Sequence, residues 1–162
     1  MHNNKLILHG SSIYLSSSKN GFAFLAKSGT GKSTHVRMLK KAFKDEINYV
    51  NDDKPFLSYE NGSFFLYGSP WNGKEHLSNN IKIELKGMFI LERSKTNEVS
   101  PLSPKDAILG LGKQLHFPKG MEETSKASSI LVALAKTIPT YKLKVNMNIE
   151  AADVSYKVMK GL

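Results

Sequence analysis

Residues 26–34 read Ala-Lys-Ser-Gly-Thr-Gly-Lys-Ser-Thr, and this glycine-rich stretch stands between an apolar run and a helical pattern. The apolar run, residues 21–26, is short and partly aromatic, which is typical of a buried strand. Beyond the glycines, Val36, Leu39 and Phe43 recur at spacings of three and four, which predicts an amphipathic helix. Strand, glycine loop and helix therefore follow one another in the order that a phosphate-binding P-loop requires.

The residue types in this loop suit a nucleotide. Glycines lack a Cβ, so the backbone can turn sharply and direct successive N–H groups at phosphate oxygens, and the positive end of the helix dipole adds to the attraction. Lys32 is expected to reach the outer phosphates, and the Ser33 hydroxyl is expected to bind Mg²⁺. The residues expected to bind the phosphates of ATP are Ser28, Gly29, Thr30, Gly31, Lys32, Ser33 and Thr34.

The loop departs from the usual pattern at its first position, where Ala26 stands in place of glycine. Alanine is small enough to keep the turn if its φ is negative, so we expect the substitution to be tolerated. The alternative is a flexible Gly/Ser loop that happens to precede a helix, which the Lys-Ser-Thr at the right offset disfavours.

Length and composition indicate one soluble domain. The chain has 162 residues, of which 40% are hydrophobic and 23% charged, and no apolar run approaches the ~20 residues of a membrane span. Its first apolar segment is too short for a secretory signal, so a cytoplasmic protein is expected. Cysteine is absent, which excludes disulfides, thiolate metal sites and cysteine nucleophiles.

The formal net charge of +9 indicates acidic ligands. The Lys and Arg residues are scattered and no run exceeds two, so nucleic acid is the less favoured partner. Nucleotide phosphates and an acidic partner explain the charge more simply.

Short strands, frequent hairpin signals and late helices predict an α/β fold whose mixed sheet contains antiparallel hairpins and a P-loop. Leu109, Leu111 and Leu115 are expected to face the core, and so is the stripe of Leu131, Leu134 and Ile138. The expected strands cover 6–8, 13–15, 21–26, 47–50, 56–59, 64–67, 86–91 and 141–145; the expected helices cover 32–43, 104–115, 122–138 and 150–159; turns are expected at 16–21 and 61–62, and a loop at 68–74.

An acidic pair, Asp52-Asp53, follows the strand at 47–50. Ligands bind at the carboxyl ends of strands in open α/β sheets, and adjacent residues there point in different directions. One carboxylate can then hold magnesium while the other faces an acceptor. The alternative is an Asn-Asp-Asp turn that merely precedes Lys54-Pro55.

These motifs resemble, in order, the ATP-binding core of HPr kinase/phosphorylase. The resemblance is greater still to the small, single-domain HPr-kinase-like proteins often described as phosphoenolpyruvate-carboxykinase-like, and it extends from about Leu6 to Lys160. The segments that carry it are His9-Gly10, Ser28 to His35, Asp52 to Pro55, Pro70 to Lys74 and Leu91 to Arg93.

The resemblance implies a nucleotide-binding core of the HPr kinase/PEP carboxykinase type and an ATP- and Mg²⁺-dependent serine kinase. It assigns the base that activates the acceptor hydroxyl to Asp52, and magnesium binding to Asp53 together with Ser33. His9 is placed near the transferred phosphate, where it assists by hydrogen bonding or by charge; the alternative is a structural histidine. The N-terminal domain of HPr kinase and its phosphorolysis signature are not found in this sequence, so neither phosphorolysis nor HPr as acceptor is implied.

Two further residues are candidates for phosphate binding. Lys74 is expected to meet a phosphate or an acidic acceptor group while Trp71 closes over the site; alternatively Trp71 lies at the edge of the core and Lys74 is solvated. Arg93 is expected to contact phosphate from the opposite side of the site, or else to form an ion pair. His2, His35, His76 and His116 show no metal-ligand spacing.

Three classes of function fit the sequence. The first is a kinase acting on a serine of a peptide or protein, the second a phosphotransferase acting on a small molecule, and the third a non-catalytic ATP-binding protein in peptide modification. The intact Lys32, Ser33, Asp52 and Asp53 argue against the third class. The exposed edges of short strands, and the oligomeric state of HPr kinase, favour a homo-oligomer.

Overall fold

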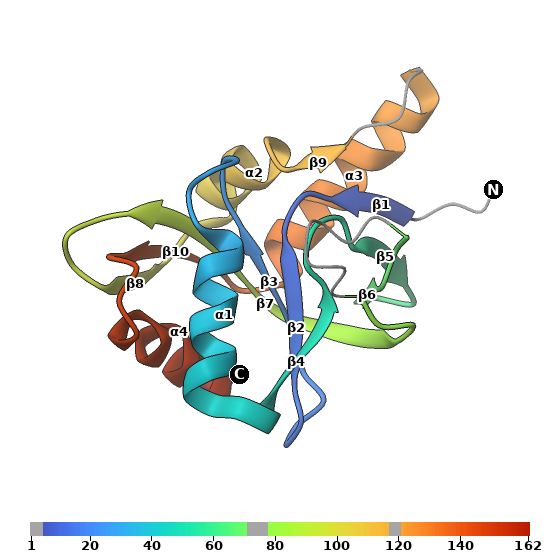
Figure 1. Cartoon of the computed structure of the whole chain (residues 1–162). Coiled ribbons are helices and arrows are strands. Elements are labelled where there is room, and N and C mark those ends of the chain that lie inside the picture. Colours follow the sequence, from blue (N-terminus) through green and yellow to red (C-terminus); the bar gives the residue numbers. More distant parts are fainter. Residues whose placement is uncertain (1–4, 71–77, 117–120) are drawn as a thin grey trace.

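The computed structural model of the protein describes residues 5–70, 78–116 and 121–162, except for the side chains of residues 121–124. In this part of the chain, helices lie on both faces of a ten-stranded mixed sheet (Figure 1). The strands are β1 (Lys5–Leu8), β2 (Ser11–Leu15), β3 (Gly21–Leu25), β4 (Ile47–Asn51), β5 (Phe56–Glu60), β6 (Ser63–Tyr67), β7 (Lys82–Arg93), β8 (Glu98–Pro101), β9 (Leu115–His116) and β10 (Thr140–Val145). The helices are α1 (Lys32–Phe43), a short 3₁₀ turn (Lys44–Glu46), α2 (Pro104–Gly112), α3 (Met121–Thr137) and α4 (Glu150–Gly161).

The strand order confirms the expected α/β fold with a mixed sheet. Along the main path it is β4-β2-β3-β7-β6-β5-β1-β9, while β10 pairs with β7 and β8 pairs with β10. Strands β3 and β10 run parallel to β7, and the other pairs are antiparallel. The central strand β7, with its two parallel neighbours, therefore belongs to the same sheet as a series of antiparallel strands.

Both expected hairpins are present. Strands β5 and β6 are joined by Asn61 and Gly62, whose φ values of 50° and 85° are those that a two-residue hairpin turn demands. Strands β2 and β3 pair from Tyr14–Gly21 to Ser11–Phe24, and Lys19 takes the left-handed conformation in the turn between them. The Asn61-Gly62 turn has the conformation that its sequence predicts, whereas the turn between β2 and β3 places its left-handed residue at Lys19 and not at Asn20-Gly21.

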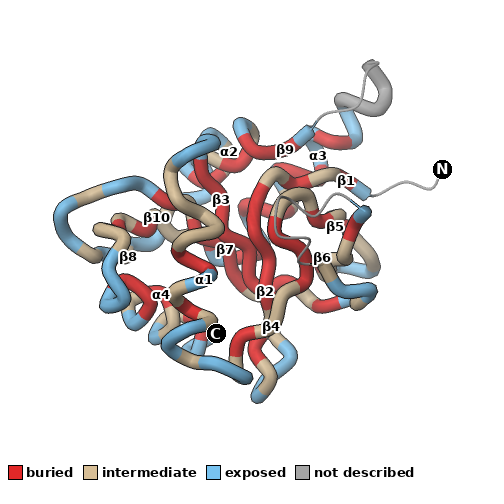
Figure 2. Tube along the Cα trace, in the orientation of Figure 1, coloured by how far each residue is buried: buried red, intermediate tan, exposed pale blue. Residues whose placement is uncertain are grey.

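Strand β3 is buried over its whole length because both of its faces are covered (Figure 2). Phe22 and Phe24 pack into a cluster with α1 and α4, whereas Ala23 and Leu25 pack into a second cluster with α2 and α3. Alternate side chains of a strand point to opposite faces, so one five-residue strand holds the two layers of helices. Ala26, the first residue of the glycine-rich stretch, is therefore held in a fixed position relative to both layers of helices.

Several sequence predictions need correction. The helix expected over 104–115 ends at Gly112, because Leu115 and His116 form β9 and pair with β1. Leu109 is 61% exposed, since it lies two residues from the buried Ala107 and Leu111 and so on the opposite side of the helix. The strand expected over 86–91 is the longer β7, and β8 was not predicted.

Leu111 and Leu115 are buried as expected, and so are Leu131, Leu134 and Ile138. The helices within the described ranges are too short or too polar to span a membrane.

His35 connects α1 to α4 inside the core. It is fully buried, its Nε2 lies 2.8 Å from Ser155 Oγ, and its ring centroid lies 5.2 Å from that of Phe24. Burial lowers the pKa of His35 to about 4, because an imidazolium would lose its hydration there. The folded protein therefore keeps this side chain neutral.

This burial predicts a pH-dependent loss of stability. Below pH 6.5 the unfolded chain protonates His35 while the folded protein resists protonation down to about pH 4, so the free energy of unfolding falls as the pH is lowered through this window. Over the whole window, His35 lowers the free energy of unfolding by about 3 kcal/mol. Urea unfolding at several pH values should show a smaller decrease between pH 7 and pH 4 for His35→Gln than for the unsubstituted protein.

Ser155→Ala is the matched control, because it removes the hydrogen bond and keeps the imidazole. It should lower stability by about 1 kcal/mol and retain the original pH dependence. An identical pH dependence for the original protein and His35→Gln would contradict the role given to burial.

Candidate active site

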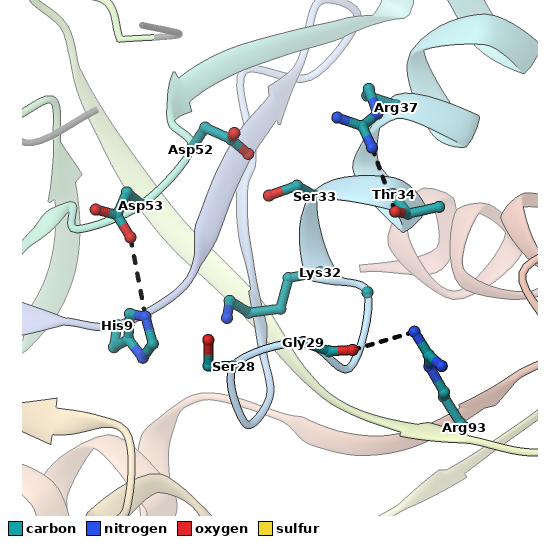
Figure 3. A pocket seen from close by; sticks show the side chains of 11 residues that line it. His9, Ser28, Gly29, Lys32, Ser33, Thr34, Arg37, Asp52, Asp53 and Arg93 are labelled. Carbon is teal, nitrogen blue, oxygen red and sulfur yellow. Dashed lines mark hydrogen bonds and ion pairs between the residues drawn. The ribbon is translucent and has the colours of Figure 1, made fainter. Parts of the chain in front are cut away.

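A cavity of about 620 Å³ opens at the carboxyl end of β3 (Figure 3). Its walls come from the turn after β1, the glycine loop of residues 26–31, the first turns of α1, the turn after β4 and the end of β7. The lining residues are His9, Ser28, Gly29, Gly31, Lys32, Ser33, Thr34, Arg37, Asp52, Asp53 and Arg93. Most of the residues predicted from the sequence therefore converge on one cavity.

The glycine loop has the backbone that its sequence predicts. Gly29 and Gly31 adopt φ values of 81° and 111°, in the left-handed region that favours glycine. A Cβ on Gly31 would also lie only 2.7 Å from Met147 Sδ. Ala26 is buried and keeps a negative φ, as expected for a tolerated replacement of glycine.

The N-terminus of α1 points at this cavity without a side-chain cap. The residue at the N-cap position is Gly31, which has no side chain that could cap the helix. The first turn carries no acidic residue. The N–H groups of that turn have no partner within the helix, and together with the helix dipole they attract an anion.

Lys32 reaches from α1 into the cavity, toward Ser28 and His9 (Figure 3). Its Nζ donates to the Ala26 carbonyl at 3.4 Å. Partial burial lowers the pKa of Lys32, and the carboxylates of Asp53 and Asp52 oppose this shift, Asp53 more strongly. Lys32 therefore faces the acidic pair across the cavity and supplies positive charge between them and the loop.

The acidic turn is held by Asn51, which the sequence analysis did not single out. Its Oδ1 accepts hydrogen bonds from the backbone N–H groups of Asp53 and Lys54, both at 2.8 Å. Its Nδ2 donates to Ser69 O and Ser78 Oγ, both at 3.2 Å. An Asn before a tight turn is the local signal for this arrangement.

Asp52 is buried, with 7% of its surface exposed, and accepts a hydrogen bond from Ser11 Oγ at 2.9 Å. Its carboxylate and the Ser33 hydroxyl point toward one another (Figure 3). Ser11 comes from β2, far from Asp52 in the sequence, and no local motif pointed to it. These oxygens offer hard ligands of the kind that Mg²⁺ prefers.

Asp53 points instead toward His9, whose Nε2 lies 3.8 Å from Asp53 Oδ1. The backbone supports this approach, because the N–H groups of His9 and Gly10 donate to Gln114 O and Asp53 O at 2.8 and 2.9 Å. Burial lowers the pKa of His9, and the charge of Lys32 lowers it further, while Asp53 acts in the opposite direction. Burial and the neighbouring lysine therefore favour the neutral form of the His9 imidazole.

Gly10 makes the position of His9 possible. A Cβ at this residue would lie 2.5 Å from Leu25 Cδ2 and 2.7 Å from the Phe24 carbonyl oxygen. Only glycine lets the turn after β1 approach the end of β3 so closely.

Arg93 holds the outside of the glycine loop. Its Nε donates to Thr30 O and its Nη2 to Gly29 O, each at 3.1 Å. Arg37, a lining residue that the sequence analysis missed, donates to Thr34 Oγ1 at 3.3 Å. It stands one helical turn after Lys32-Ser33, and that spacing was the available signal.

Some sequence predictions concern residues that the structure does not describe. Trp71, Lys74 and His76 lie between its described ranges, and His2 precedes them. Within the described ranges, no group of three or more His, Cys, Asp and Glu side chains gathers as a metal site. A cation here would rest on Ser33, the acidic pair and phosphate oxygens, which fits the few protein ligands that Mg²⁺ takes in kinase sites.

The electrostatic setting of His9 can be tested by NMR titration of its imidazole. Lys32→Met removes a cation and should raise the pKa of His9, whereas Asp53→Asn removes an anion and should lower it. Lys41→Met, on an exposed position of α1, should leave it unchanged. Equal pKa values for His9 in all of these proteins would contradict the geometry of the cavity.

The mixed sheet, the glycine loop at the end of β3 and helix α1 after it form a fold that is also found among solved structures. A solved structure with this fold is that of the HPr(Ser) kinase/phosphatase from Coxiella burnetii, with a TM-score of 0.52 over 96% of this chain and 97% of that chain. The two sequences are 13% identical, so the likeness concerns the fold. No protein-family model matches the chain, and no curated protein matches its sequence.

Proposed function

We propose that the protein is a kinase that uses ATP and Mg²⁺ to phosphorylate a serine hydroxyl of a peptide or protein. The observation that carries the proposal is the convergence of Lys32, Ser33, Asp52 and Asp53 on one cavity in a kinase-like fold. The Coxiella protein is described as a kinase/phosphatase acting on HPr(Ser), which supports serine as the acceptor class.

The residues present fit a nucleotide and its metal. The uncapped first turn of α1 and the left-handed glycines would hold the phosphates, with Lys32 at their outer end. A Mg²⁺ ion held here would supply positive charge that neutralises the terminal phosphates of ATP. Ser33 and one carboxylate of the acidic pair would hold the metal, and the other carboxylate would accept the proton of the serine hydroxyl.

Side-chain orientation decides how we divide these two roles. The resemblance to HPr kinase implies Asp52 as the base and Asp53 at the metal, but Asp52 is buried, bonded to Ser11 and directed at Ser33. Asp53 is about one-third exposed and lies beside neutral His9. We therefore propose the opposite division: Asp52 joins Ser33 at the metal, and Asp53 is the base.

Two asparagine variants test this division. Asp53→Asn should leave the affinity for Mg·ATP nearly unchanged and lower turnover by about 10²–10⁴, the usual contribution of a general base. Asp52→Asn should instead raise the Mg²⁺ concentration required for half-maximal turnover. The readouts are phosphopeptide formation by mass spectrometry and nucleotide affinity by calorimetry with and without Mg²⁺.

The exchanged result would restore the division that the resemblance implies, with Asp52 as the base. Full turnover in both variants would remove the acidic pair from the chemistry.

Nucleotide binding is tested separately with Lys32→Ala. Loss of this cation at the outer phosphates should weaken ATP and tripolyphosphate binding by about tenfold or more, because a charge-assisted hydrogen bond contributes ~1.5–3 kcal/mol. Lys41→Ala, an exposed lysine on the same helix, is the control and should bind both normally. Unchanged affinity in Lys32→Ala would refute the assignment of the glycine loop.

The acceptor class is tested by incubating the protein with Mg·ATP and a panel of serine peptides, proteins including HPr, and small hydroxyl compounds. Phosphate on a peptide serine, lost in Asp53→Asn, supports the proposal. Phosphate only on a small molecule would support a small-molecule phosphotransferase. ATP binding without any phosphorylated product would support a non-catalytic nucleotide-binding protein.

A further inference from the structure

A second cavity, of about 700 Å³, lies on the other side of the glycine loop. Its walls are residues 26–30 of that loop, residues 90–93 at the end of β7, and Gly110, Lys113 and Gln114 at the end of α2. We infer that this acceptor cavity binds an acidic segment next to the serine that receives the phosphate. The inference rests on the proposed kinase function.

The acceptor cavity adjoins the site already described. Ser28, Gly29 and Arg93 line both cavities, so only the edge of the glycine loop separates them. Lys32 points toward Ser28 and His9, which marks that edge as the end where the outer phosphate would lie (Figure 3). A peptide lying in the acceptor cavity therefore has a short path to the reacting phosphate.

Backbone contacts connect the acceptor cavity to the same end of the site. The carbonyl of Gln114, in its wall, accepts the N–H of His9 at 2.8 Å. His9 in turn lies beside Asp53, the proposed base. A serine presented from the acceptor cavity would thus arrive on the side of the loop that carries the proton acceptor.

The acceptor cavity has an apolar floor and a basic mouth. Ile90 lies in its floor, on the face of the sheet that packs against α2 and α3, and Gly110 lets α2 approach it, since a Cβ at Gly110 would lie 2.5 Å from Ile90 Cδ1. At the mouth, Lys27 and Lys113 are exposed. An extended peptide can lay its backbone over such a floor and direct acidic side chains at the lysines.

The charge of the mouth is largely unopposed. Within the part of the chain that the structure describes, no carboxylate forms an ion pair with Lys27 or Lys113. Glu92 is the one acidic side chain among the described residues of the wall, and it is paired with Lys142 at 3.0 Å. Uncompensated positive charge beside a cavity attracts and orients an anionic partner.

A nucleoside is the competing occupant, and the lining disfavours it. Bases are held by stacking on aromatic rings and by specific polar groups, but no aromatic side chain is among the described residues that line this cavity. Two lysines on flexible stems recognise charge and not the neutral edges of a base. An acidic peptide uses every feature of the lining.

The test is the sequence preference of the protein for a degenerate library of serine-centred peptides with Mg·ATP. The unsubstituted protein should enrich Asp and Glu beside the serine. K27E/K113E should lose or reverse this preference and raise KM for an acidic peptide selected from the library by about tenfold, as expected when two exposed ion pairs become repulsions. Fluorescence anisotropy of the labelled acidic peptide, with Mg·ADP present, gives a second readout independent of turnover.

K41E/K136E is the matched control, because it changes net charge equally at exposed lysines on α1 and α3. It should keep the acidic preference; if it loses the preference as K27E/K113E does, the effect is one of overall charge and the inference is wrong. Absence of any acidic preference in the unsubstituted protein also overturns it.

Binding of ATP and of tripolyphosphate separates the remaining outcomes. Lys27 belongs to the glycine loop, so this comparison uses the single variant K113E, which should bind both as the unsubstituted protein does. Weaker binding of ATP with unchanged binding of tripolyphosphate would give the cavity to the nucleoside and overturn the inference. Failure of the unsubstituted protein to bind Mg·ATP would instead refute the proposed function itself.

Discussion

The pairing of β7 with two parallel neighbours is the constraint on which the rest of the structure depends. Leu25, the last residue of β3, pairs with Ile90, and Leu143 of β10 pairs with Leu91. The carboxyl ends of these three strands therefore lie on the same side of the sheet. The glycine loop leaves β3 at that edge, and Arg93 at the end of β7 bonds two of its carbonyls. Register in the sheet thus sets the shape of the loop.

Core packing then fixes the direction of α1. His35 bonds Ser155, and the rings of Phe43 and Tyr156 stack with their centroids 3.7 Å apart, so both ends of α1 are tied to α4. A helix N-terminus binds an anion only if its N–H groups point at the ligand. The buried imidazole of His35, which follows the cavity residues Ser33 and Thr34 on α1, therefore supports the phosphate site from within the core.

Local features were predictable from the sequence, and long-range ones were not. The glycine loop and the Asn61-Gly62 turn follow from φ preferences of a few residues, so both were predicted correctly. The end of α2 depends on β9 pairing with β1, which no local pattern reports. Ser11 donates a hydrogen bond to Asp52 from forty-one positions away in the sequence, so this contact could be found only in the folded chain.

The low pKa of His9 bears on how the site would work. In its neutral form the imidazole can donate or accept a hydrogen bond but brings no charge to the phosphates, and the positive charge then comes from Lys32, Arg37, Arg93 and the helix N-terminus. Of the two roles that the resemblance allows for His9, hydrogen bonding is favoured over charge. Protonation of His9 at lower pH would add a cation beside Asp53 and weaken that carboxylate as a base.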